Sequence, residues 1–254
     1  AEYSRLIKDL LEKGVAYKTT STIYFDTTKI ANYGAFGGSA STEHGRIEAD
    51  PEKKHPEDFA LWKFSEDEKV GFNSPLGRGF PGWHIECTAM SFKYLGKKFD
   101  IHTGGVDHIG VHHTNEIAQA EALTGENPAN FWIHNEHLTM KGAKMAKSAD
   151  GFLSLQKIKE LGVSALSYRY FLLTARYSTR VDYSIEALKA SDTAYQKVLN
   201  AVANLDTREG IVLDTYRSKF LDAVNDDLDT PKALALLWEL LKDDGISKKK
   251  KKAT

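Results

Sequence analysis

A histidine and a glutamate four residues apart, His112 and Glu116, carry the clearest chemical signal in this sequence. In a helix that spacing places both side chains on one face. Imidazole and carboxylate are both zinc ligands, and Cys87, the single cysteine of the chain, would add a thiolate from another segment. The alternative is a capping histidine, a surface glutamate and a cysteine that acts as a small apolar side chain. Spacing alone leaves both interpretations open.

The segment around these residues, 83–116, also contains five of the nine histidines. In it, His102 is expected to end a strand directly before a turn that contains Gly104 and Gly105. The missing side chains of the two glycines would let a small ligand approach the backbone, although an ordinary turn explains them nearly as well. Asp107, which follows, could bind a ribose hydroxyl. This segment is therefore expected to form one wall of an active site.

A basic loop follows at 141–151, with Lys144 and Lys147 in the pentapeptide KMAKS. Two lysines three residues apart on a loop can converge on phosphate oxygens, where they stabilise the charge that develops on a leaving pyrophosphate. A solvated turn is the usual role of such a loop. Met145 favours the first interpretation, because an apolar side chain between the lysines would anchor the loop.

The composition of the chain excludes few functions. Its 254 residues suffice for one large domain or two small ones. The 34 lysines and arginines nearly balance the 35 aspartates and glutamates, so net charge gives no argument for nucleic acid as a partner. A single cysteine excludes an internal disulfide and fits a reducing compartment. No apolar run approaches the length of a membrane span, and the first residues are not a signal peptide. We therefore expect a cytoplasmic protein with no membrane partner.

The elements that must position the site alternate between helix and strand. Trp83 at the start of one helix and Trp132 in one strand are expected in the core more often than against a ligand. Short connections between these elements predict parallel α/β units, whose ligands gather at the carboxyl ends of the strands. Apolar spacing predicts helices over 1–14, 83–95 and 112–124, strands over 22–26, 58–64, 99–105 and 131–140, and a loop over 78–82.

The chain after residue 153 has a helical pattern throughout. Helices are expected over 164–175, 184–205, 216–224 and 230–241, the last with Thr230 as its cap and Pro231 in its first turn. Five consecutive lysines, 248–252, are expected to form a solvated or artificially appended tail. Contact of these lysines with RNA is the weaker alternative.

Four segments together resemble the cysteinyl-tRNA synthetases, a family of class I aminoacyl-tRNA synthetases. KMAKS is a variant of the class I KMSKS signature with Ala146 in the serine position, and the resemblance extends from residue 1 to about residue 241. The segments follow the motifs of the family in order and spacing: GWHIEC at 82–87, FDIHTGGVD at 99–107, HHTNEIAQAEA at 112–122 and KMAKS at 144–148.

The resemblance implies an α/β fold in three parts. Residues 1–153 would form a partial class I synthetase Rossmann-like catalytic domain with a connective insertion. Residues 154–245 would form a helical stem-contact and tRNA-binding region, and residues 246–254 a lysine-rich tail.

The resemblance also implies zinc bound by Cys87, His112 and Glu116. Trp83 and His102 would lie around the bound substrate cysteine, whose thiolate the zinc takes directly in such enzymes. A soft metal prefers thiolate to hydroxyl by a wide margin, whereas a pocket shaped for cysteine cannot strongly reject serine by volume. Zinc would therefore remove the need for editing.

ATP, accompanied by Mg²⁺, would lie at Gly104, Gly105, Asp107 and Lys147. Lys144 and Lys147 would be the catalytic lysines at the phosphates. The reaction implied has two steps: ATP and L-cysteine give cysteinyl-adenylate and pyrophosphate, and the acyl group then passes to tRNA(Cys). The enzyme is expected to act as a monomer.

This sequence departs from the family pattern in four ways. It has neither a HIGH-like tetrapeptide nor the additional zinc cysteine that precedes it in the family, and Thr103 stands where the family usually has glycine. The anticodon-reading domain that follows in the family is also missing, so we expect a fragment of a synthetase. Two alternatives remain: the related cysteine ligase of mycothiol synthesis, and a non-catalytic zinc- or tRNA-binding module.

Overall fold

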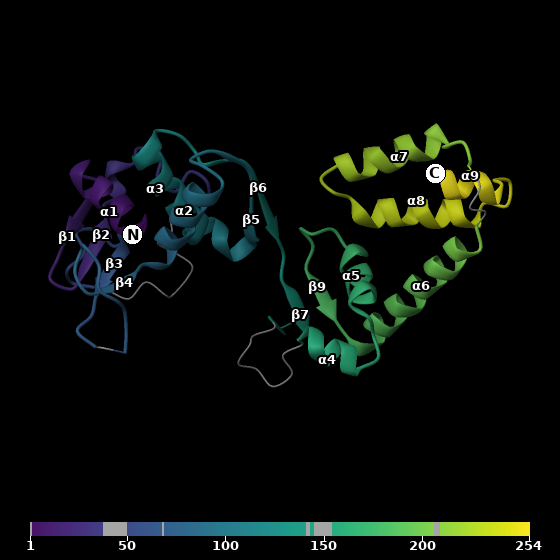
Figure 1. The fold of residues 1–254 in the computed structure, drawn as a ribbon, viewed down its shortest axis with the longest axis horizontal. Coiled ribbons are helices and arrows are strands. Elements are labelled where there is room, and N and C mark those ends of the chain that lie inside the picture. The colour runs from purple at the N-terminus through teal and green to yellow at the C-terminus, as the bar shows by residue number, and fades with distance from the viewer. Residues whose placement is uncertain (1, 38–49, 68, 141–142, 145–153, 206–208) are drawn as a thin grey trace. The chain divides into compact units, whose positions relative to one another are not determined.

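The computed structural model describes residues 2–37, 50–67, 69–140, 143–144, 154–205 and 209–254, with the side chains of 143 and 144 left aside (Figure 1). Two compact units divide the chain, residues 1–134 and 135–254. The expected domain boundary after residue 153 lies at the edge of a segment outside the described residues, so it stays a prediction.

The first unit contains a four-stranded antiparallel sheet with the strand order β1-β2-β3-β4. The link between β1 and β2 is only three residues long, which requires antiparallel pairing there, because parallel neighbours need a crossover of a dozen residues or more. The parallel units expected from the helices and strands of residues 83–140 do not include this sheet, and they stay a prediction. The segment expected as a loop at 78–82 instead contributes its edge strand. The strands are β1 (Ala16–Lys18), β2 (Thr22–Phe25), β3 (Phe59–Phe64) and β4 (Gly79–Pro81).

Three helices pack around this sheet: α1 (Glu2–Glu12), α2 (Trp83–Tyr94) and α3 (Thr114–Thr124). The apolar face of α1, with Ile7 and Leu10, is fully buried against Leu61 and Trp62 of β3 in one core cluster. Gly14 ends the first helical segment as expected, since its φ of 69° is open mainly to glycine. A short 3₁₀ helix, η1 (Thr27–Lys29), follows β2.

A second pair of strands, β5 (Phe99–Gly105) and β6 (Ala129–Asn135), flanks α3 in the chain order. Between β5 and α3 lie the 3₁₀ turn η2 (Val106–His108) and a π-helical turn, η3 (Ile109–His113). The helix expected from residue 112 thus becomes regular only at Thr114. Isolated π turns of this kind occur frequently at functional sites.

The second unit combines a small sheet with helices. Strand β7 (Leu138–Met140) pairs in parallel with β9 (Val181–Tyr183) and antiparallel with β8 (Ala143–Lys144). The strand expected over 131–140 is therefore two strands in different sheets. The helices are α4 (Leu155–Glu160), α5 (Ala165–Leu173), α6 (Ile185–Ala203), α7 (Asp214–Asn225), α8 (Thr230–Lys242) and α9 (Lys248–Ala253).

Two details of these helices differ from expectation. Asp229, and not Thr230, caps α8 by accepting a hydrogen bond from the backbone N–H of Lys232 at 3.1 Å. The lysine run is the short helix α9, in which Nζ of Lys251 donates to the carbonyl of Leu241 at 2.7 Å. Among the described helices, none combines the length and the apolar character that crossing a bilayer demands.

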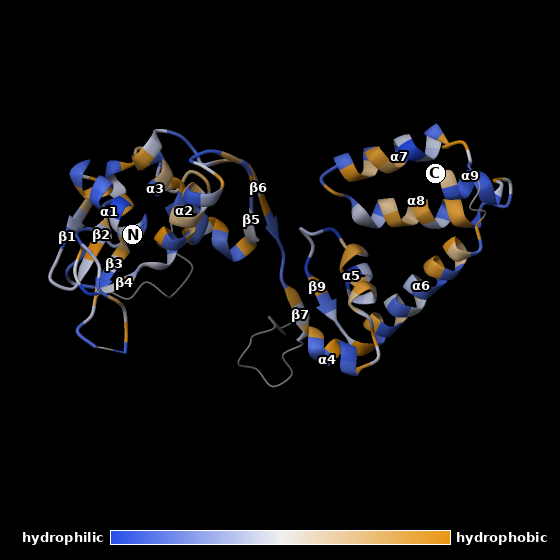
Figure 2. Ribbon diagram, in the orientation of Figure 1, coloured by the Kyte–Doolittle hydropathy of each residue, from blue (hydrophilic) through white to orange (hydrophobic). Residues whose placement is uncertain are grey.

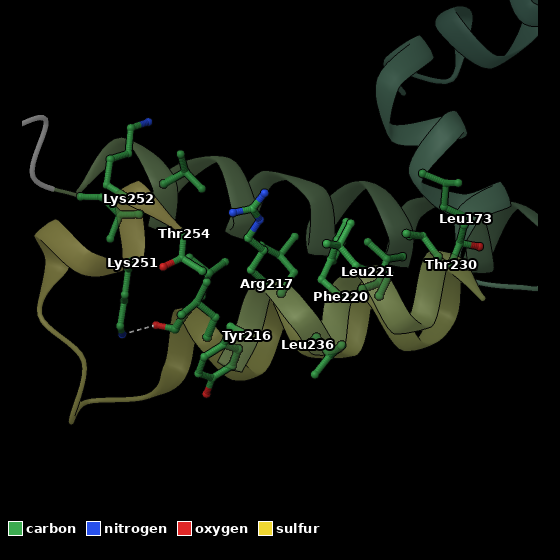
Figure 3. Close-up of a pocket in the computed structure, with 18 residues that line it drawn as sticks. Leu173, Tyr216, Arg217, Phe220, Leu221, Thr230, Leu236, Lys251, Lys252 and Thr254 are labelled. Atoms are coloured by element: carbon green, nitrogen blue, oxygen red, sulfur yellow. Dashed lines mark hydrogen bonds between the residues drawn. The ribbon is translucent and has the colours of Figure 1, made fainter. Parts of the chain in front are cut away.

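An apolar pocket of about 540 Å³ lies along α7 and α8 in the second unit (Figure 3). Phe220 and Leu221 of α7 and Leu236 of α8 line it, and Lys251 lies toward one end. Figure 2 shows apolar residues recurring along α6 and α8, as expected for helices with one packed face. No residue predicted to bind substrate, ATP or zinc lines this pocket.

A substitution in the core of the first unit tests the packing described above. Leu61 on β3 is fully buried, so Leu61→Ala is expected to destabilise this unit by about 2–5 kcal/mol through lost burial and an unfilled cavity. Urea unfolding followed by tryptophan fluorescence measures the change. Lys63→Ala, an exposed position on the same strand, is the matched control and should change stability by less than about 0.5 kcal/mol. Equal effects of the two substitutions would contradict the described core.

Candidate metal and substrate site

Cys87, His112 and Glu116 converge on one point in the first unit. Their ligand atoms all lie within 4.8 Å of one another. Cys87 comes from α2, His112 from the end of the π-helical turn and Glu116 from the first turn of α3. His112 and Glu116 are each only 3% exposed, so the interpretation of Glu116 as a surface residue is wrong.

The carboxylate of Glu116 lies between two histidines. Nε2 of His112 is 2.8 Å from Oε1, and Nε2 of His102 is 3.4 Å from Oε2. Burial by itself would raise the pKa of Glu116, but its contacts with these two imidazoles outweigh it and hold the pKa at about 2. Oε1 is buried, and the close contact with Nε2 of His112 lacks the geometry of a hydrogen bond, so this oxygen has no hydrogen-bond donor among the described residues. A buried, ionised oxygen left in this state fits a bound cation.

Cys87 is half-buried beside this carboxylate. Burial, and then the negative charge of Glu116, raise the pKa of the Cys87 thiol to about 11. The thiol is therefore neutral in the protein alone, and a bound cation would reverse this by stabilising the thiolate. One sulfur, one imidazole and one carboxylate form a donor set that suits zinc. The residues present therefore fit the metal that the resemblance implies.

A further histidine, His84, holds His112 in place, since their Nδ1 atoms lie 3.0 Å apart. Burial lowers the pKa of His84 to about 3, so this imidazole is neutral. Metal-binding histidines commonly have the second ring nitrogen engaged in this way, which fixes the ring and the tautomer. Sequence reasoning missed this positioning role of His84, although the density of histidines in 83–116 was a signal for it.

The two tryptophans differ in their surroundings. Trp83, the first residue of α2, is 55% exposed, so the expectation that it belongs to the core is wrong. Its ring centroid lies 4.4 Å from that of His112, which places an accessible aromatic surface beside the candidate ligands. Trp132 is half-buried and packs against His102 and His113, with centroids 4.6 and 4.9 Å apart.

The glycine pair is part of strand β5, so His102 lies within the strand and not at its end. A Cβ on Gly104 would lie 2.5 Å from Cε1 of His113 and 2.9 Å from Nδ1 of His108. Imidazoles therefore occupy the space that a side chain at 104 would need. Gly105 ends β5, and Asp107 is exposed in η2. Their role toward ATP stays a prediction.

The structure does not describe the side chain of either lysine of KMAKS. The backbone of Lys144 belongs to β8, and Lys147 lies outside the described residues. Their assignment to the phosphates of ATP stays a prediction from the sequence.

The fold is similar to that of solved tRNA synthetases. It is similar to Mycobacterium tuberculosis methionyl-tRNA synthetase bound by methionyl-adenylate, with a TM-score of 0.60 and 16% identity over 100% of this chain and 69% of that one. Residues 1–193 match the family described as tRNA synthetases class I (C) catalytic domain, and the chain belongs to this family. The α/β fold and the family expected from the sequence are thereby confirmed.

Curated relatives similar to this chain in sequence are named cysteine–tRNA ligases. The chain is 42% identical to cysteine–tRNA ligase 1 of Burkholderia lata, over 96% of this chain and 53% of that protein. It is 39% identical to the cysteine–tRNA ligase of Treponema denticola, over 98% of this chain and 57% of that protein. The chain thus spans about half the length of the curated relatives it matches.

The start of α2, which carries Cys87, depends on a close backbone approach. A Cβ on Gly82 would lie 1.8 Å from the carbonyl oxygen of Ala60, so Gly82→Ala must displace the start of this helix or the start of β3. We expect a destabilisation of about 1–3 kcal/mol, measured by urea unfolding.

Gly110→Ala is the matched control, because the nearest atom to a Cβ there, the carbonyl oxygen of Gly37, is 3.8 Å away. A tolerated Gly82→Ala, with stability like that of Gly110→Ala, would contradict the close approach.

Proposed function

We propose that this chain serves in a cysteine–tRNA ligase, in which it selects L-cysteine for activation by ATP and transfer to tRNA(Cys). The observation that carries the proposal is the convergence of Cys87, His112 and Glu116 within 4.8 Å, in a chain of the class I (C) catalytic domain family. Relatives named cysteine–tRNA ligase, which match over nearly the whole of this chain, support the same activity.

Zinc is the cofactor proposed for this site, held by these three residues. Three protein ligands are typical of catalytic zinc sites, which keep a further position open for water or substrate. Bound zinc would supply a soft Lewis acid that prefers a thiolate to a hydroxyl ligand. His102 and His84 would orient two of these ligands. His102 contacts the carboxylate of Glu116, and His84 contacts the ring of His112.

The preference for a sulfur ligand would provide the specificity that shape cannot. Serine differs from cysteine at one atom, and a pocket defined by volume discriminates poorly between such similar side chains. Each 1.4 kcal/mol of difference in binding free energy corresponds to about a tenfold discrimination. The exposed ring of Trp83, beside His112, would form an apolar wall against the substrate side chain.

ATP with Mg²⁺ is proposed to bind at Gly104, Gly105, Asp107 and Lys147, with Lys144 and Lys147 as the catalytic lysines. The support for these residues is the order and spacing of their motifs in the sequence. The lysines would stabilise negative charge on the departing pyrophosphate when the carboxylate of cysteine attacks the α-phosphate. The helices after residue 154 are proposed to contact the stem of tRNA(Cys).

The zinc site is tested by the metal content of the purified chain, measured by elemental analysis. We expect about one zinc per chain, and a clear loss in Cys87→Ala because a thiolate ligand is removed. Met90→Ala changes an exposed side chain on the same helix and should leave the zinc content unchanged. Equal zinc content in the wild type and Cys87→Ala would contradict the assignment of Cys87.

The catalytic assignment is tested by ATP–pyrophosphate exchange that depends on cysteine and not on serine. Lys147→Ala is expected to slow exchange by about 10²–10³-fold, the usual loss when one stabilising charge is removed, with the zinc content intact. Lys157→Ala, on α4, is the control. Zinc binding without any exchange would favour a non-catalytic binding module, and acylation of an amino sugar in place of tRNA(Cys) would favour the mycothiol ligase.

A further inference from the structure

We propose that Glu116 is shared by two metal sites, and that His102 and His113 complete the second with it. This second site would bind a divalent transition-metal ion such as zinc through nitrogen and oxygen alone, without Cys87. Ligand atoms of His102, His113 and Glu116 all lie within 4.8 Å of one another, as do those of the first group. The inference stands apart from the proposed function, because it concerns binding without the thiolate.

The two oxygens of Glu116 face different partners. Oε1 is 2.8 Å from Nε2 of His112, which belongs to the first group, and Oε2 is 3.4 Å from Nε2 of His102, which belongs to the second. The carboxylate therefore presents one oxygen to each group, and a cation at the second site would need no rotation of this buried side chain.

The ring of His113 is held with one nitrogen engaged. Its Nδ1 lies 2.7 Å from Nε2 of His134, which leaves its Nε2 as the ligand atom. His134 thus has the same relation to His113 that His84 has to His112, where the Nδ1 atoms lie 3.0 Å apart. An engaged second nitrogen is the arrangement that metal-binding histidines commonly show.

The surroundings restrict both imidazoles of the second group. The ring of Trp132 packs on His102 and His113, and those two rings meet edge to face with centroids 4.7 Å apart. His113 also occupies the space over Gly104 that any side chain at that position would need. Ligands fixed before the ion arrives lose less conformational entropy on binding it.

A simpler role for His102 would be to orient Glu116 for the first site. In that case His113 would take no part in metal binding, and removing its imidazole would leave the affinity for metal unchanged. The two interpretations therefore differ in what happens at His113 once the thiolate has been removed.

Cobalt(II) is a suitable probe, because a thiolate ligand gives a charge-transfer band in the near ultraviolet that nitrogen and oxygen ligands do not give. We would titrate the full chain with cobalt(II) as wild type, as Cys87→Ser, and as Cys87→Ser with His113→Gln. We expect Cys87→Ser to lose the charge-transfer band but still to bind cobalt, seen in its visible d–d bands. Adding His113→Gln should then weaken cobalt binding at least tenfold.

Two further variants guard against misfolding and non-specific binding. His102→Gln in the Cys87→Ser background changes the less buried ligand and should weaken cobalt binding in the same way, with unchanged circular dichroism. His108→Gln in that background is the control, since His108 neighbours His113 but is not a member of the group. Its cobalt affinity should stay as in Cys87→Ser.

Either of two results would overturn the inference: Cys87→Ser binds no cobalt, or it binds cobalt equally well with and without the imidazoles of His102 and His113. Failure of the proposed zinc site would look different. The wild type would then lack the charge-transfer band, while binding through His102 and His113 would persist in Cys87→Ser.

Discussion

The buried carboxylate of Glu116 is the charge around which the first unit is arranged. Its position in the first turn of α3, against α2 and β5, leaves it 3% exposed among imidazoles and a half-buried thiol. An ionised carboxylate that is removed from water must be compensated by a partner of opposite charge, by hydrogen bonds or by a metal ion. His102 and His112 provide that compensation in the protein alone, and a cation would provide it more completely.

The core of the first unit is what makes this arrangement possible. Helix α2 is fixed at its start by the close approach of Gly82 to the start of β3, and Ile85 and Ala89 bury its inner face in the core. Cys87 lies on this helix between Ile85 and Ala89, the two residues buried in the core. The site thus depends on a small antiparallel sheet that itself contributes none of the predicted ligands.

Imidazole pairs repeat around this carboxylate. His84 contacts His112, and His134 contacts His113. Each of the two consecutive histidines, His112 and His113, thus has its Nδ1 in contact with another imidazole. His112 and His113 are the last two residues of the π-helical turn Ile109–His113, directly before α3. Such a concentration of imidazole nitrogens around one carboxylate suits a metal centre.

The sequence by itself determined the family, most of the helices and the metal-ligand candidates. Local signals sufficed there, because helical spacing, glycine stops and the order of short motifs are all encoded over a few residues. The sequence did not determine that Gly79–Pro81 forms an edge strand, that Trp83 is exposed, or that Gly104 makes room for imidazoles. Each of these depends on neighbours distant in the chain. Only the tertiary structure decided that Cys87 and Glu116 share one site with His112, because burial and ligand distance arise from packing between helices and not from spacing along one of them.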